Sequence, residues 1–270
     1  MMAVMEAEIE APASVRHTDV TMSDGVRIHV MEAGEGVPVV LLHGYTSCND
    51  AGWFANGFAK ELSRTHRVIG IDARGHGRSE KPHDPSLYDG DRMPRDVIEV
   101  LDRLGIDRAH FHGYSMGGGI VAHLMARWPD RFITAGFGGS GVRETDGALS
   151  AQAAARDPQG LDADQDAGRA ALAARADRDN EALKAVQDGR QARPSTAPEL
   201  DLTTIAFPVL AVNGEFDAPI SKTQRLEREV KDFRAVILPG HGHNTVTTAG
   251  FTPRLYIDTV ADFVRANDPK

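Results

Sequence analysis

The heptapeptide GYSMGGG, residues 113–119, places a single serine, Ser115, among four glycines. Glycine costs conformational entropy on folding, so it is kept where the backbone turns sharply or where another group approaches closely. Two kinds of site are compatible with such a stretch: a loop that cradles phosphate groups, and a sharp turn that presents a nucleophile. The rest of the sequence decides between them.

The residue types do not support a phosphate-binding loop. A P-loop needs a lysine at the end of its glycine-rich stretch, and no lysine occurs between residues 82 and 183. The stretch GHGRSE, residues 75–80, follows an apolar run, but Glu80 stands where the dinucleotide-binding fingerprint needs its last glycine. Both phosphate interpretations therefore fail.

The residues around Ser115 instead match G-x-S-x-G, the strand-to-helix turn that exposes a serine hydroxyl above a sheet. The run 109–114 predicts a strand that ends at this turn, and the apolar residues that follow Ser115 predict a helix. The free N–H groups of that helix would lie beside the hydroxyl. The sequence therefore predicts a nucleophile at Ser115.

Apolar runs alternate with helical patterns along the chain, which predicts an α/β fold: a mostly parallel sheet with helices on both faces. A β-hairpin is expected around the Asp24-Gly25 turn. Helices are expected over residues 94–104, after Ser115, and at the C-terminus, where Leu255, Val260, Phe263 and Val264 suggest a packed helix. The strands are expected at residues 16–22, 26–32, 37–42, 67–72, 109–114, 207–214 and 234–240.

Residues 143–205 differ in composition from the rest of the chain, because they contain no Phe, Trp or Tyr and are rich in Ala, Arg and Asp. Leu172, Ala176, Leu183 and Val186 are candidates for one apolar stripe, which Asp179 interrupts. We interpret residues 143–205 as a small helical cap insertion, and residues 1–142 and 206–270 as one core.

A serine hydroxyl needs a base, which lies downstream when the chain order is serine, acid, histidine. His123 falls within the helix expected after Ser115, which leaves His241 and His243, in a glycine-flanked loop after the last predicted strand. An acid must fix the tautomer of the histidine. Asp217 follows the strand at 207–214, so it and the histidine loop are expected at the carboxyl ends of adjacent strands.

An oxyanion hole would complete the site. One donor is the backbone N–H of Met116, the residue after the nucleophile, and the second is assigned to the backbone N–H of Tyr45, in the loop after residues 37–42. A single donor of this kind is worth about 3 kcal/mol in the transition state.

The motifs LLHGYTS, DARGHGRS, GYSMGGG, NGEFD and LPGHGH, in this order, resemble the α/β-hydrolase fold superfamily. The resemblance covers the chain from about residue 16 to its end, except for residues 143–205, which stand where the family carries its cap. It implies that His243 is the base and His241 a bystander, since the last family motif usually ends Gly-x-Gly-His or Gly-x-Asp-His. It also implies that Asp217, rather than Glu215, is the acid.

Other polar residues are expected to have structural roles. His43 would brace the oxyanion loop, and Asp72, Arg74, His76 and Arg78 would order the loop that carries them. Cys48 is expected to be an unreactive thiol. No metal site is expected at His241 and His243, because no cysteine or carboxylate cluster accompanies them.

Serine at position 115 indicates acyl transfer, whereas family members that open epoxides or displace halide have aspartate there. We expect a carboxylesterase for small to medium acyl chains, which works through an acyl-enzyme and needs no metal or organic cofactor. Lactone hydrolysis, perhydrolysis, thioester hydrolysis and carbon–carbon bond hydrolysis stay open, as does a non-catalytic protein that binds a ligand.

Global properties exclude several classes of protein. The formal charge of −9 and the pI near 5.6 give no electrostatic reason to bind nucleic acid or an anionic membrane. The single cysteine allows no intrachain disulfide, residues 1–14 lack the pattern of a secretory signal, and no run of about 18 apolar residues occurs. We expect a cytoplasmic protein that acts on a small-molecule ester; the oligomeric state stays open.

Overall fold

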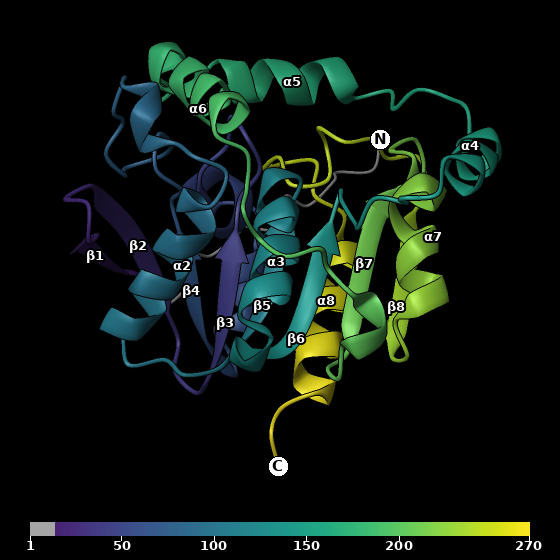
Figure 1. Cartoon of the computed structure of the whole chain (residues 1–270), viewed down its shortest axis with the longest axis horizontal. Coiled ribbons are helices and arrows are strands. Elements are labelled where there is room, and N and C mark those ends of the chain that lie inside the picture. The colour runs from purple at the N-terminus through teal and green to yellow at the C-terminus, as the bar shows by residue number, and fades with distance from the viewer. Residues whose placement is uncertain (1–13) are drawn as a thin grey trace, which may run out of the picture.

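The apolar runs of the sequence form the strands of one eight-stranded sheet in the computed structural model, which describes residues 14–270 (Figure 1). The predicted α/β class is therefore confirmed, and most predicted strand boundaries lie within two residues of those observed. The strands are β1 (Arg16–Thr21), β2 (Arg27–Ala33), β3 (Val37–Leu42), β4 (His66–Ile71), β5 (Ala109–Tyr114), β6 (Phe132–Gly138), β7 (Val209–Gly214) and β8 (Phe233–Leu238).

The strand order in the sheet is β1-β2-β4-β3-β5-β6-β7-β8. The hairpin of β1 and β2 is antiparallel, as predicted, and β2 also runs antiparallel to β4. The remaining neighbours in the sheet, β4-β3-β5-β6-β7-β8, all run parallel to one another. The carboxyl ends of β3, β5, β7 and β8 therefore meet at one edge, which is where the sequence places its candidate site residues.

The sequence did not predict β6, which lies between β5 and β7. All seven of its residues are buried, but Gly136 and Gly138 interrupt its apolar pattern. Gly136 pairs with His112 on β5, and a Cβ built on Gly136 would lie only 2.1 Å from Nδ1 of His112. The glycine that hides the strand in the sequence is needed to make room for this imidazole.

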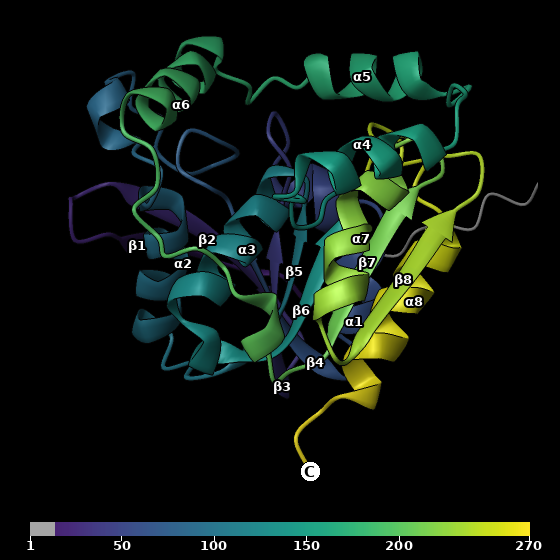
Figure 2. The same cartoon turned by 45° about the vertical axis from the view of Figure 1, so that its right-hand side comes forward.

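Helices cover both faces of the sheet (Figures 1 and 2). Side chains of α2, α3 and α7 pack into one core, and those of α1 and α8 into a second core on the opposite face. The C-terminal helix is confirmed, although Leu255 is 51% exposed rather than packed. The helices of the two faces are α1 (Phe58–Leu62), α2 (Arg92–Arg103), α3 (Met116–Arg127), α7 (Pro219–Glu229) and α8 (Arg254–Ala266).

Residues 143–205 form three separate helices, α4 (Gly147–Arg156), α5 (Gln165–Ala173) and α6 (Asn180–Ala192), which lie over the carboxyl edge of the sheet (Figure 2). The candidate apolar stripe is interrupted at Asp179, as expected from the sequence. Asp179 ends the stripe because its carboxylate accepts hydrogen bonds from the N–H groups of Glu181 and Ala182, and so starts α6.

Short helical turns complete the described chain, at Asp50–Phe54, Pro85–Leu87, Pro129–Arg131 and Leu202–Thr204. The prediction that residues 1–14 are not a secretory signal concerns mainly residues 1–13, which lie outside the described residues. Within residues 14–270 no helix has the length and apolarity needed to cross a bilayer. The cytoplasmic location stays a prediction.

Candidate active site

The turn at Ser115 has the backbone geometry expected of an exposed nucleophile. Ser115 has φ 52° and ψ −108°, a conformation that non-glycine residues rarely adopt and that costs folding free energy. A Cβ on Gly113 would lie 2.2 Å from the carbonyl oxygen of Gly117, and a Cβ on Gly117 would lie 2.1 Å from that of Leu42. These two glycines are therefore needed for the turn to form.

The other two glycines of the heptapeptide serve different purposes. A Cβ on Gly118 would lie 1.9 Å from Oγ of Ser140, so the packing of α3 against the segment after β6 needs glycine there. Gly119 has open space around it and lines the cavity next to Ser115. The backbone alone does not require this last glycine.

Ser115, His243 and Asp217 form one hydrogen-bonded chain. The hydroxyl Oγ of Ser115 lies 2.9 Å from Nε2 of His243, and Nδ1 of His243 lies 2.8 Å from Oδ2 of Asp217. Ser115 follows β5, Asp217 follows β7, and His243 lies in the loop after β8. The Asp217 side chain is 9% exposed, and that of His243 is 39% exposed.

The structure thus brings His243, rather than His241, into hydrogen-bond contact with Ser115. His123 lies on α3, where its Nδ1 is 3.1 Å from Oγ of Ser195. Glu215 is half-buried, and its Oε2 accepts a hydrogen bond from the N–H of Gly240 at 2.8 Å, so it braces the loop after β8.

Two further contacts of this loop were not found in the sequence. The hydroxyl of Tyr114 donates to the carbonyl oxygen of His243 at 2.5 Å. The carboxylate of Asp162, between α4 and α5, accepts from the N–H of Gly242 at 2.8 Å and from the hydroxyl of Thr245. The histidine loop is therefore fixed partly by the helical segment above it, and nothing in the spacing of Asp162 indicates that pairing.

The two candidate oxyanion donors belong to segments that lie next to Ser115. Met116 is the first residue of α3, and a Cβ on Gly44 would lie 3.5 Å from Cβ of Ser115. Within residues 14–270, neither the N–H of Met116 nor that of Tyr45 donates to another residue. The structure thus gives neither amide another partner, and their role as oxyanion donors stays a prediction.

His43 holds the loop that carries Tyr45, as predicted. Its Nδ1–H donates to the carbonyl oxygen of Gly44 at 2.8 Å, and its Nε2 accepts from the N–H of Ala73 at 3.0 Å. Complete burial lowers the pKa of His43 to about 4, so the imidazole stays neutral and can both donate and accept.

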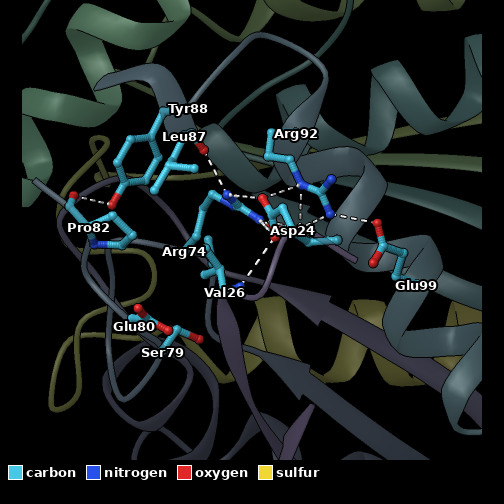
Figure 3. Close-up of polar contacts among 12 residues, drawn as sticks. Asp24, Val26, Arg74, Ser79, Glu80, Pro82, Leu87, Tyr88, Arg92 and Glu99 are labelled. Atoms are coloured by element: carbon cyan, nitrogen blue, oxygen red, sulfur yellow. Dashed lines mark hydrogen bonds and ion pairs between the residues drawn. The ribbon is translucent and has the colours of Figure 1, made fainter. Parts of the chain in front are cut away.

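The loop after β4 is ordered by its own polar residues, which confirms their predicted structural role. The carboxylate of Asp72 accepts from the N–H groups of Asn49 and Arg78, both at 2.8 Å. Arg74 is completely buried and contacts Asp96 through Nε at 2.6 Å, Asp24 through Nη1 at 3.0 Å and the carbonyl oxygen of Leu87 at 2.7 Å (Figure 3).

The carboxylate of Asp217 has a second partner that the sequence did not reveal. Nζ of Lys222, on α7, forms an ion pair with Oδ1 of Asp217, while Oδ2 faces His243. Lys222 is 24% exposed, and burial lowers the pKa of its ammonium group despite the opposing charge of Asp217. The two oxygens of the carboxylate are thus shared between a cation and the imidazole.

A cavity of about 640 Å³ opens next to Ser115. Its walls come from the serine turn, the segment after β6, α6, α7 and the histidine loop. They are formed by Ser115, Met116, Gly119, Gly139, Ser140, Gly141, Val142, Arg143, Arg190, Asp217, Ser221, Lys222 and His243.

Cys48 and a cluster of two histidines and an aspartate have surroundings that bear on reactivity and ion binding. Cys48 is buried, and burial raises the pKa of its thiol to about 12, so it is not a thiolate at neutral pH. His66, His110 and Asp268 place their donor atoms within 4.8 Å of one another at the amino edge of the sheet. There Oδ1 of Asp268 lies 3.1 Å from Nε2 of each imidazole, which leaves all three groups hydrogen-bonded.

Comparison with known proteins gives a family match over part of the chain. Residues 37–140 match the family model of the alpha/beta hydrolase fold. A putative non-heme haloperoxidase of Mycobacterium phage D29 is 36% identical over 121 residues, which cover 45% of this chain and 42% of that protein. The 2-hydroxymuconate semialdehyde hydrolase of Pseudomonas putida is 37% identical over 110 residues, which cover 41% and 38%. The chain thus spans about two fifths of the length of these curated relatives.

Among solved structures, a thermophilic esterase from Thermogutta terrifontis superimposes with a TM-score of 0.72 at 20% identity, over 94% of this chain and 100% of that one. The likeness in fold therefore extends well beyond the segment matched by the family model. The strand order, the serine turn and these matches show that the chain has the α/β-hydrolase fold.

Proposed function

We propose that this protein is a serine hydrolase that cleaves carboxylic esters of small to medium acyl chain through an acyl-enzyme. The observation that carries the proposal is the contact of 2.9 Å between Oγ of Ser115 and Nε2 of His243, which continues at 2.8 Å to Asp217. This is the arrangement in which an imidazole accepts a serine proton while a carboxylate stabilises the imidazolium that forms.

In the first half-reaction, Oγ of Ser115 attacks the ester carbonyl carbon as Nε2 of His243 takes the hydroxyl proton. The carbonyl oxygen becomes an oxyanion, which the N–H groups of Met116 and Tyr45 stabilise. When the tetrahedral intermediate collapses, the carbon–oxygen bond to the alcohol breaks and His243 gives its proton to the departing oxygen. The products of this half are the free alcohol and an acyl group on Ser115.

In the second half-reaction, His243 removes a proton from water as the water oxygen attacks the acyl carbon. The intermediate collapses with return of the proton to Oγ of Ser115, and the carboxylic acid leaves. Asp217 keeps Nδ1 of His243 protonated throughout, so that Nε2 is the nitrogen that exchanges protons.

The walls of the cavity support the proposed preference for small to medium acyl groups. Residues 138–206 supply no aromatic side chain, and the apolar side chains that line the cavity are those of Met116 and Val142. We propose in addition that residues 143–205 act as a cap over the core formed by residues 1–142 and 206–270. The position of α5 and α6 over the carboxyl edge supports this division (Figure 1).

The test is the initial rate of p-nitrophenyl butyrate hydrolysis by the wild-type protein and by Ser115→Ala. We expect the variant to lose at least about 10⁴-fold in kcat, because the nucleophile acts together with its base. The same comparison with p-nitrophenyl esters of longer acyl chains should give rates that fall beyond hexanoate.

A matched pair of variants separates the two histidines of the loop. His243→Gln should lose as much activity as Ser115→Ala, whereas His241→Gln should keep the wild-type rate. Circular dichroism would establish that each variant is folded. Equal rates for the wild-type protein and Ser115→Ala would refute the proposal.

A further inference from the structure

Three basic side chains converge on the cavity beside Ser115 from different parts of the fold. Arg143 follows β6, Arg190 lies on α6, and Lys222 lies on α7. The only carboxylate among the residues that line this cavity is that of Asp217. This surplus of positive charge is unusual for a chain that carries a net charge of −9.

The three cations differ in their partners. Lys222 is paired with Asp217, as described above. Arg143 and Arg190 are exposed, and within residues 14–270 neither guanidinium group has a hydrogen bond or an ion pair. Each therefore keeps five N–H donors for another molecule.

The neighbouring carboxylates do not neutralise these arginines. Asp157, near Lys222, is 8% exposed, and its oxygens accept from the N–H of Ile220 at 2.7 Å and from the hydroxyl of Ser221. Asp89 borders a smaller cavity that Arg190 also lines, where Oδ1 of Asp89 accepts from the N–H of Asp91 at 2.9 Å. No ion pair joins either carboxylate to Arg143 or Arg190.

We propose that Arg143 and Arg190 form an anion-binding subsite, and that the ester substrate carries a carboxylate on its acyl or alcohol portion. The proposal rests on the esterase function proposed above and names its substrate class. A guanidinium group presents paired N–H donors in the geometry that a carboxylate accepts, and a locally positive cavity in an acidic protein concentrates anions. The subsite would orient the substrate relative to Ser115 without taking part in proton transfer.

The first test uses esters matched in size and different in charge. One pair is the p-nitrophenyl monoester of glutaric acid and p-nitrophenyl valerate, in which the charge lies on the acyl side. The other pair is 4-(butyryloxy)benzoate and phenyl butyrate, in which the charge lies on the alcohol side. After subtraction of the uncatalysed rate, we expect kcat/KM of the wild-type protein to favour the anionic ester at least tenfold in one of the pairs.

The variants Arg143→Gln, Arg190→Gln and their combination should lower this preference, and the double variant should bring the ratio close to one while kcat/KM for the neutral esters changes less than threefold. Arg103→Gln, an exposed residue at the end of α2 that lines no part of the cavity, removes the same charge elsewhere and should keep the wild-type ratio. Added salt at 0.5 M should weaken the preference of the wild-type protein but not its activity on neutral esters.

A binding measurement separates failure of the subsite from failure of the esterase function. Isothermal titration of glutarate into Ser115→Ala should show binding that the double arginine substitution weakens at least tenfold, and inorganic phosphate should bind more weakly than glutarate. Binding that depends on both arginines would support the subsite even if no ester were hydrolysed.

Two results would overturn the proposal. The first is hydrolysis that depends on Ser115 but proceeds equally well with charged and neutral esters in both pairs, which would leave the esterase function standing. The second is arginine-dependent binding of phosphate in preference to glutarate, which would replace the carboxylate by another anion.

Discussion

Two groups of arginines in this protein have opposite relations to their surroundings. Around Arg74, two arginines and three carboxylates are packed together, and Arg92 contacts Asp96 at 2.9 Å and Glu99 at 2.6 Å (Figure 3). At the cavity wall, Arg143 and Arg190 have no partner among the described residues. Arginine thus fixes a loop in the first group, whereas in the second group it is left without a partner among the described residues.

The difference follows from burial. The side chain of Arg74 is 0% exposed, so each of its polar groups must be satisfied inside the protein, and the charge of Asp96 together with its hydrogen bonds raises the pKa of Arg74 although burial alone would lower it. Arg143 and Arg190 are solvated, so they can stay unpaired without cost until an anion displaces water. Buried pairing indicates a structural role, and unpaired charge at a cavity indicates a binding role.

The largest effect on the free energy of unfolding is expected at acidic pH, because several histidines are buried in their neutral form. The buried histidines named below have lower pKa values in the folded protein than in the unfolded chain. Their contribution to the free energy of unfolding is therefore fully present above about pH 6.5 and is lost as the pH falls towards 4. Near pH 5 the free energy of unfolding should fall by about 5 kcal/mol per pH unit. Burial lowers the pKa to about 4 in His43 and His110 and to about 3 in His76 and His112.

Urea unfolding at pH 7, 6 and 5 would measure this slope. Substitution of one of these histidines, His110→Gln, should reduce the slope by about a quarter. A free energy of unfolding that is unchanged between pH 7 and pH 5 would show that burial does not control these imidazoles.

The next effect concerns the paired arginine itself. Arg74→Met should lower the free energy of unfolding by about 3–5 kcal/mol, since it removes the completely buried cation that contacts both Asp96 and Asp24 and leaves Arg92 as the remaining arginine beside these carboxylates. Chemical denaturation monitored by tryptophan fluorescence would measure the change. A loss below about 1 kcal/mol would contradict the structural role of this cluster.

Lys222 is an intermediate case, because it is a cavity cation with a partner. Its ammonium group partly neutralises the negative charge of Asp217 that acts on His243. Removal of this positive charge in Lys222→Met should therefore stabilise the imidazolium form of His243. The acid limb of the kcat/KM profile should then move to higher pH. Lys222→Arg, which keeps the charge, should keep the wild-type limb, and a profile that does not move in Lys222→Met would show that the lysine has no influence on the base.

The smallest effect is expected from the unpaired arginines on stability. Arg143→Met and Arg190→Met should each change the free energy of unfolding by less than about 0.5 kcal/mol, because no contact within the described chain is lost. The same denaturation experiment measures it. A loss as large as that of Arg74→Met would erase the distinction between the two groups and assign both to the structure.

Much of the fold and of the candidate site could be predicted from residue order. Ser115, Asp217 and His243 each follow a predicted strand, and the carboxyl ends of parallel strands meet at one edge, so their approach follows from the topology. The roles of these residues, and those of Met116 and Tyr45, stay predictions for the experiments above. Helix α7 was missed, because its mostly polar sequence gives no clear apolar stripe.

The sequence by itself determined the α/β class and the serine turn, because both depend on local patterns. These patterns are the apolar runs that alternate with helical segments, and the glycines that allow close backbone approach. Only the tertiary structure decided which cation shares Asp217, that Asp162 fixes the histidine loop, and which arginines are left unpaired. These relations join residues from separate elements, and side chains of the same type were available to pair in many ways. Packing selects among them, since burial forces some charges to find partners and leaves others exposed to solvent.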